Sequence, residues 1–327
     1  MKAIHKPAGV LLALAVSAFC AVGAAHAAYP HDKPIEVISP YAAGGANDFL
    51  TRMMAKELAE ELKANSVAEN KAGANGIVGA SYVAKSAPDG YTLLMGNSAT
   101  HGTNPTLYPK TPYDALKDFD PVAMVGAVPI VLVVNSALGI NSVKELLAYG
   151  KANPGKLSFG SSGIGGTGHL AGEAFKAASH IDMVHAPYKG DAPAVTDAMG
   201  GQVAMSFVGV ASAYPQLASG KIKVLAVAHP ERLASLPDVP TMAEAGFKDV
   251  VFSQWYALVT RAGAPADRIN MLNAASKDIL AKDNVKKSLA KLGAVPIYMT
   301  APELKDFMTK EISRFGKIIR DLGIKLN

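Results

Sequence analysis

Five glycines in nine residues, from Gly160 to Gly168, form the segment of this chain best suited to hold a ligand. The segment follows a short apolar run at 157–159 and leads into a stretch with helical periodicity from His169. Glycine lets the backbone curl, and the first N–H groups of a helix have no acceptor inside that helix. The pattern predicts a strand, a loop and a helix that together bind an anion.

Three interpretations of this loop stay open. Gly163–Gly168 matches G-x-G-x-x-G of dinucleotide-binding folds, but it lies mid-chain, and the next strand runs into His185-Ala-Pro187 without the expected acid. In the second interpretation the glycines serve only the turn. The third is a cradle for a small carboxylate. Its expected contact residues are Ser161, Gly166, Thr167, Gly168 and His169.

Two further loops have a similar character. Pro40–Gly45 follows an apolar strand at 35–39 and precedes a helix that starts near Asn47, and Gly96–His101 follows the strand at 91–95. Loops after parallel strands lie at one edge of the sheet, so we expect these two to meet. Three or four hydrogen bonds to a carboxylate give roughly 5–12 kcal/mol, against about 8 kcal/mol for micromolar binding. The candidate contacts are Tyr41, Ala42, Ala43, Gly44, Asn97, Ser98 and Thr100.

Motifs of catalysis are missing from the sequence. It contains no G-x-S-x-G, no H-E-x-x-H and no G-x-x-x-x-G-K. His169 with Glu173, or His180 with His185, could form a pair of metal ligands, but two ligands do not make a site. We therefore expect no metal, no cofactor and no enzymatic activity.

The first 27 residues have the pattern of a secretory signal peptide. Lys2 and Lys6 precede an apolar run, and Ala25-His26-Ala27 is a small-x-small cleavage sequence. Cleavage after Ala27 would export the chain to the periplasm. The single cysteine, Cys20, lies in this leader behind a phenylalanine, which disfavours lipid attachment although a lipoprotein stays an alternative. Without disulfides, the remaining chain must be held by its core.

Charge and periodicity limit the remaining classes. The net charge is +5 with Lys and Arg interspersed among acids, so no basic stripe for nucleic acid is present. No run after the leader is apolar enough to span a membrane. Strand and helix patterns alternate over 35–95, which predicts β-α-β-α-β with parallel strands. The class is therefore α/β.

A second α/β series interrupts the first one. The apolar run 122–134 is broken at Pro129 and predicts either two strands or one bent strand that passes between domains, and Trp255–Thr260 predicts the return. We expect domain 1 at 28–128 plus 254–327 and domain 2 at 129–253. The cleft between the two domains is the expected site.

Motifs along the whole mature chain resemble the Bug family of periplasmic solute receptors, the extracytoplasmic binding proteins of tripartite tricarboxylate transport systems. The motifs that carry this resemblance are Pro40–Gly45 with Asn47-Asp48, Pro88–Leu94, Asn104-Pro105 with Leu107-Tyr108 and Pro112–Asp114, His169–Glu173, Pro187–Gly190, and Leu236–Thr241 with Ala243–Gly246. The resemblance implies a type II-like Venus flytrap that closes on an organic acid. It also implies transporter subunits as partners, and we expect a monomer.

Some positions depart from the family pattern. The family often has Ser or Thr where this chain has Gly166 and Gly168, and Asp or Asn where it has Val208-Gly209. We therefore expect a ligand whose far end is less polar than an amino acid, such as a plain or aromatic carboxylate. Tyr188 is a further candidate contact, with a rigid turn as the alternative. A sensor of a two-component system and a periplasmic enzyme stay the alternative functions.

Overall fold

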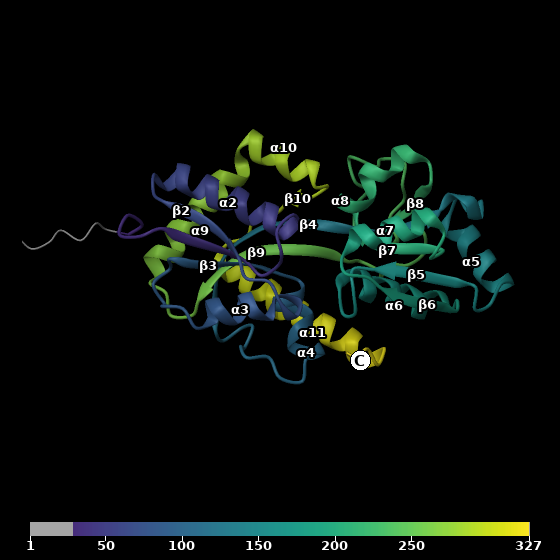
Figure 1. Cartoon of the computed structure of the whole chain (residues 1–327), viewed down its shortest axis with the longest axis horizontal. Coiled ribbons are helices and arrows are strands. Elements are labelled where there is room, and N and C mark those ends of the chain that lie inside the picture. The colour runs from purple at the N-terminus through teal and green to yellow at the C-terminus, as the bar shows by residue number, and fades with distance from the viewer. Residues whose placement is uncertain (1–28, 327) are drawn as a thin grey trace, which may run out of the picture.

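The computed structural model describes residues 29–326, and the predicted signal peptide at 1–27 lies outside the described residues. Figure 1 shows two lobes side by side, one built from both ends of the described chain and the other from its middle. The fold is mixed α/β. Within residues 29–326, no helix combines the length and apolar character needed to cross a bilayer.

The first lobe has a parallel core of three strands. Strand β1 pairs in parallel with β2 on one side and with β3 on the other. The elements of this part are β1 (Ile35–Ser39), α2 (Ala46–Leu62), β2 (Ser66–Asn70), η1 (Ala74–Gly76), α3 (Ile77–Ala84), β3 (Thr92–Asn97), η2 (Ala99–Thr103) and α4 (Asn104–Leu107). The predicted β-α-β-α-β order over 35–95 is confirmed.

The chain returns to this lobe with antiparallel strands. Strand β9 pairs antiparallel with β3 and with β4, and β10 pairs antiparallel with β4. These elements are β4 (Phe119–Asn135), β9 (Ser253–Arg261), α9 (Ala266–Ala281), α10 (Asp283–Lys291), β10 (Val295–Pro296) and α11 (Ala301–Asp321).

Alternating side chains of the strands bury opposite faces of the sheet. Val37 of β1 packs in a cluster with α2 and α9, whereas its neighbour Ile38 packs with α3 and α11. Both side chains are fully buried. Period-two burial on both faces is what a sheet covered by helices requires. Figure 1 shows α2 and α11 on opposite sides of the strands.

The apolar run broken by Pro129 is one strand, so of the two predicted possibilities the single strand is confirmed. Strand β4 is 17 residues long. Up to Pro129 it pairs with β9, where Pro129 lies opposite Ser253, and from Ile130 it pairs with β7, where Ile130 lies opposite Gly209. Proline has no N–H to donate, and the pairing partner changes directly after it.

The second lobe is a smaller α/β unit on the same strand. Strand β5 pairs in parallel with β6 and β7, while β7 and β8 pair antiparallel with β4. Its elements are η3 (Ser136–Leu138), α5 (Val143–Ala152), β5 (Leu157–Ser161), α6 (Thr167–Ser179), β6 (Met183–Pro187), α7 (Asp191–Gly200), β7 (Met205–Gly209), α8 (Val210–Ala213), η4 (Tyr214–Ser219) and β8 (Ile222–Val227).

Helix α11 packs under both lobes. Thr300 and Glu303 form a reciprocal capping box at its start. Leu304 and Met308 pack with β1 and β3 of the first lobe, whereas Phe315 and Ile319 lie in the cluster of the second lobe. In Figure 1 the yellow helix runs from the first lobe toward the gap between the two.

Candidate functional site

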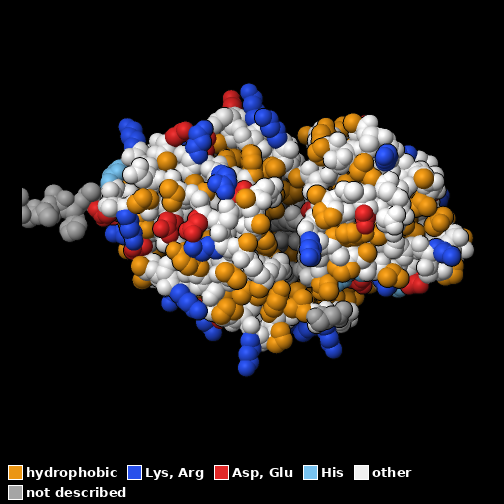
Figure 2. All heavy atoms as spheres, viewed as in Figure 1, with side chains coloured by type: hydrophobic (Ala, Val, Ile, Leu, Met, Phe, Trp, Pro, Cys, Tyr) orange, Lys and Arg blue, Asp and Glu red, His pale blue; other side chains and the backbone are white. Residues whose placement is uncertain are grey.

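The predicted loops leave their strands where the two lobes face each other. Figure 2 shows a hollow between the two lobes at this level of the molecule. Hydrogen bonds connect the loop after β1 to the loop after β3 within the first lobe, and connect the loop after β3 to the start of α6 across the hollow. The common edge expected from the parallel strands is therefore present in each lobe, and the two edges meet.

The loop after β1 has several N–H groups without an acceptor. Within residues 29–326, the N–H groups of Ala42 and Ala43 make no hydrogen bond. Gly44 turns the chain with a φ of +96°, and its N–H donates to Oδ2 of Asp48 at 3.0 Å. Burial opposes the charge on Asp48, but hydrogen bonds from Gly44 and its other partners lower the pKa of this carboxyl. The turn is thereby held with its free N–H groups in place.

The loop after β3 is held by the amide of Asn97. Its Oδ1 accepts from the N–H of Ala99 at 3.1 Å and of Thr100 at 3.0 Å, and its Nδ2 donates to Oη of Tyr41 at 3.0 Å. Burial raises the pKa of Tyr41 to about 12, so the phenol is neutral. Asn97 therefore fastens its own loop and connects it to the loop after β1.

A hydroxyl pair joins the two lobes. Oγ of Ser98 in the first lobe lies 3.0 Å from Oγ1 of Thr167 at the start of α6 in the second. Both residues are buried. Nearby, Gly165 lies so close to Leu107 of α4 that a Cβ there would be 2.0 Å from the leucine Cδ2. The glycine loop thus lies directly against the first lobe.

The start of α6 supplies further N–H groups without acceptors. The first backbone bond across this start runs from Leu170 N–H to Gly166 O at 3.0 Å. Within the described residues, the preceding N–H groups of Thr167, Gly168 and His169 therefore have no acceptor. Unpaired N–H groups at a helix start attract anions.

Two stacked histidines support the glycine loop from behind. His169 Nδ1 accepts from the N–H of Gly165 at 3.0 Å, and its ring stacks on His185 with centroids 3.8 Å apart. Nε2 of His185 lies 2.7 Å from Oγ of Ser161. Burial lowers the pKa of His169 to about 3 and that of His185 to about 4, and for His169 the neighbouring ring adds to the effect. Both rings are neutral, and His169 orients the loop through its side chain.

Steric crowding explains why glycines stand at the start of α6. A Cβ on Gly168 would lie 2.1 Å from the carbonyl oxygen of Phe207, so the helix start touches the end of β7 backbone to backbone. A Cβ on Gly166 would lie 3.0 Å from Oγ of Ser162. No side chain fits at Gly168 without moving the strand.

The remaining predicted contacts are placed differently. Val208 is fully buried in β7, opposite Val131, and its side chain belongs to the core. Tyr188 donates its hydroxyl to Oδ2 of Asp197 at 2.7 Å. Only the ring of Tyr188, which lies beside Gly160, is left to meet a ligand. For these residues ligand contact stays a prediction.

Asp191 is a residue of this region that the sequence analysis did not single out. Its Oδ2 accepts from the N–H of Gly209 at 3.0 Å and from Nε2 of Gln254 at 3.1 Å. Burial raises the pKa of its carboxyl, against the opposing effect of these hydrogen bonds and of Ser162. Its partners are 18 and 63 residues away in the sequence, so only its place after Pro187-Tyr-Lys-Gly190 could have drawn attention to it.

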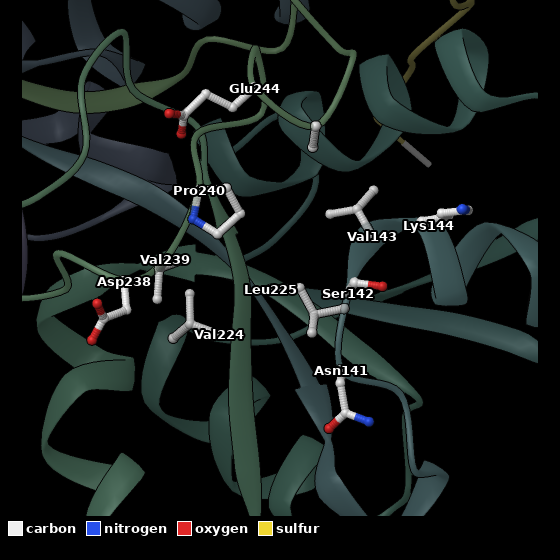
Figure 3. A pocket seen from close by; sticks show the side chains of 11 residues that line it. Asn141, Ser142, Val143, Lys144, Val224, Leu225, Asp238, Val239, Pro240 and Glu244 are labelled. Atoms are coloured by element: carbon white, nitrogen blue, oxygen red, sulfur yellow. The ribbon is translucent and has the colours of Figure 1, made fainter.

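A cavity of about 420 Å³ lies elsewhere, on the second lobe. Figure 3 shows it between the start of α5, strand β8 and the segment around Pro240. None of its lining residues belongs to the loops described above. Within residues 29–326 there is also no group of three or more His, Cys, Asp or Glu side chains that could hold a metal, and His169 Nε2 lies 3.8 Å from Glu173 Oε1.

Similar proteins share this architecture over most of their length. Protein BugT of Bordetella pertussis is 37% identical, with 90% of each chain covered. An R. palustris protein solved with adipate is 32% identical with a TM-score of 0.83, covering 91% of this chain and 99% of the other. MatC from Rhodopseudomonas palustris, solved with bound malate, is 31% identical with a TM-score of 0.77, covering 88% and 98%.

The family assignment agrees with these similarities. Residues 50–324 match the model described as "Tripartite tricarboxylate transporter family receptor". That range includes the loop after β3, the glycine loop and all of the second lobe. The chain therefore belongs to the receptor family of tripartite tricarboxylate transporters, as its resemblance to the Bug proteins predicted.

Proposed function

We propose that this chain is a periplasmic receptor that captures a small organic carboxylate between its lobes and delivers it to a tripartite tricarboxylate-type transporter. One observation carries the proposal. The contact of Ser98 with Thr167 brings together two lobes whose loops both have unused N–H groups. Ala42 and Ala43 contribute them from one side, and the start of α6 contributes them from the other.

Neutral donors suffice for this task. Each hydrogen bond to a charged acceptor contributes about 1.5–3 kcal/mol, and micromolar binding needs about 8 kcal/mol. Three or four hydrogen bonds from the N–H groups of Ala42, Ala43, Thr167, Gly168 and His169 reach that range before desolvation is counted. The adipate and malate found in two relatives are small organic carboxylates, which supports the same class of ligand here.

The roles of the residues follow from their contacts. We infer that Ala42, Ala43, Thr167, Gly168 and His169 bind the carboxylate through their N–H groups. The supporting residues shape or border the cleft. They are Tyr41, Gly44, Asn97, Ser98, Thr100, Ser161, Gly166, Tyr188 and Gly209, whereas Val208 would act only through its backbone because its side chain lies in the core.

The proposal also includes the domain boundaries, the cellular location and the partners of the receptor. The change of pairing partner after Pro129 supports a division into 28–128 plus 254–327 and 129–253. Export after cleavage behind Ala27 would place the receptor in the periplasm, where membrane subunits of a tripartite transporter would receive the ligand. The receptor would act as a monomer and return its ligand unchanged, without cofactor or catalysis.

A binding screen tests this function. The chain from residue 28 would be titrated by calorimetry with monocarboxylates, dicarboxylates, hydroxy acids and amino acids after a thermal-shift survey, in which ligands raise the melting temperature by mass action. Mass spectrometry would check that the ligand is recovered intact. Saturable binding of an unchanged acid supports a receptor. Turnover of the acid, or no binding across the panel, contradicts it.

A further inference from the structure

The carboxyl group of Asp191 lies among the cleft-side ends of three structural elements. It begins α7, contacts Gly209 at the end of β7 and contacts Gln254 at the start of β9. The preceding N–H of Gly190 donates to the carbonyl of Ser162 in the glycine loop at 3.2 Å. Asp191 is therefore attached to the glycine loop and to the strand that returns to the first lobe.

One oxygen of this carboxyl group lacks a partner. Both hydrogen bonds that Asp191 accepts end on Oδ2, while Oδ1 is buried and makes no hydrogen bond within residues 29–326. The hydrogen bond that connects α7 to β7 uses only Oδ2, so this structural role does not need Oδ1. The hydroxyl of Ser162 lies near enough to lower the pKa of this carboxyl, but it makes no hydrogen bond to Oδ1. A buried acceptor without a donor is costly, so Oδ1 has capacity for a further donor.

The neighbours of Asp191 carry no positive charge. Its polar neighbours are the N–H of Gly209, the amide of Gln254 and the hydroxyl of Ser162, all of them neutral. The Oε1 of Gln254 accepts in turn from Tyr256 at 3.2 Å. The titratable groups that act on this cluster are Tyr256 and, through it, Tyr41. A cationic or neutral hydrogen-bond donor of the ligand would therefore bind favourably at Oδ1. A second carboxylate of the ligand would be repelled by the carboxylate of Asp191.

Gly209 leaves room for this carboxyl. A Cβ at that position would lie 3.1 Å from Oδ2 of Asp191 and 3.1 Å from Cγ1 of Val128. The sequence alone suggests that Val208-Gly209 removes a polar group from the cleft. In the structure the carboxyl of Asp191 occupies the space next to Gly209, so this part of the cleft keeps an acidic group that comes from α7.

We propose that Oδ1 of Asp191 accepts a hydrogen bond from a donor group at the far end of the bound acid, so that the ligand carries an amino or hydroxyl group besides its carboxylate. This inference rests on the proposed function, which places the carboxylate on the N–H groups of the loops. It replaces the expectation of a ligand whose far end is less polar than an amino acid. Asp191 then discriminates among different carboxylic acids by their far ends, and the loops bind the carboxylate group that all of these acids have.

Matched ligands and an isosteric variant test the inference. For chain lengths of four, five and six carbons, calorimetry would compare the plain acid, the ω-hydroxy acid, the ω-amino acid and the diacid. The variant Asp191→Asn keeps an acceptor for Gly209 and turns the other atom into a donor. Asp182→Asn, an exposed acid of the same lobe, is the charge-matched control.

We expect the wild type to prefer the amino or hydroxy acid of one length over the plain acid and the diacid. Asp191→Asn should weaken the amino acid about tenfold to a hundredfold, roughly one charge-assisted hydrogen bond. The hydroxy acid should lose less affinity, because its hydroxyl can also accept a hydrogen bond from the new amide N–H of Asn. The plain acid should be unaffected, and the control should bind like the wild type.

The outcomes separate this inference from the function. Equal binding of plain acid, diacid and amino acid at every length, unchanged by Asp191→Asn, overturns the inference and leaves the receptor function intact. Failure of every carboxylate to bind the wild type overturns both. Ratios of affinities within one variant are insensitive to a loss of folded protein, so a less stable variant still decides the question.

Discussion

Thr167 allows a backbone hydrogen-bond donor to be removed without breaking its helix. It is the first residue of α6, and proline is well tolerated at this position because the N–H there has no helical acceptor. The preceding Gly166 has φ −67° and ψ 158°, the extended conformation that a residue before proline requires. Thr167→Pro removes the N–H and the hydroxyl, whereas Thr167→Val removes only the hydroxyl.

The comparison of the two variants isolates one N–H group. Both lose the bond between Thr167 and Ser98, so that loss cancels in the ratio of their affinities. A hydrogen bond from an N–H to a carboxylate is worth about 1.5–3 kcal/mol, which corresponds to roughly 10–150-fold in the dissociation constant. Proline should leave thermal stability equal to that of the valine variant or slightly higher, since it restricts the unfolded chain.

Calorimetry with the best acid of the screen would give both dissociation constants, and thermal unfolding would check the fold. We expect Thr167→Pro to bind at least tenfold more weakly than Thr167→Val, at equal or higher melting temperature. Equal affinities would refute the idea that the start of α6 holds the carboxylate. A strongly lowered melting temperature of the proline variant would refute the claim that the N–H of residue 167 makes no hydrogen bond within the folded chain.

Two further predictions concern the support of the loops. Gly168→Ala should lower the melting temperature by roughly 2–5 °C, since overpacking against the Phe207 carbonyl costs about 1–3 kcal/mol. The control Gly200→Ala, in open helical space, should stabilise by about 0.5–1 kcal/mol, and equal melting temperatures would contradict the packing. The lowered pKa values of His169 and His185 keep both rings neutral when folded, whereas the unfolded chain takes up protons near pH 6.5. Stability in urea should therefore be complete above that pH and fall by about 2 kcal/mol by pH 5, roughly half the unscreened value. A shallower fall in His185→Gln would support this, and no fall in the wild type would contradict it.

Much of the fold follows from local patterns in the sequence. Short apolar runs predict the strands β1 and β3, and the apolar run broken at Pro129 predicts either two strands or one bent strand that passes between domains. The antiparallel direction of β9 is not visible in its own residues, because strand direction depends on which neighbour the chain reaches after the second lobe. The choice between one strand and two at Pro129 depends likewise on pairing with Ser253 and Gly209, which are distant in the sequence.

Only the local features of the candidate site could be predicted from the sequence, because contacts between distant segments leave no local pattern. Glycine-rich loops before helices are local features, so the loops around Gly44 and Gly166 could be found from the sequence. The contact of Gly168 with the carbonyl of Phe207 and the place of Asp191 beside Gly209 arise only when distant strand ends meet. The glycine at 168 therefore suggested a loss of ligand contacts, although it also has a packing role.

A crystal structure with the tightest-binding acid of the screen tests the central claim most directly. The account predicts the carboxylate between the lobes, with its oxygens within hydrogen-bonding distance of the N–H groups of Ala42 or Ala43 and of Thr167 to His169. Density for the acid in the cavity beside Val143 and Pro240, or a carboxylate held by charged side chains away from both loops, would contradict it.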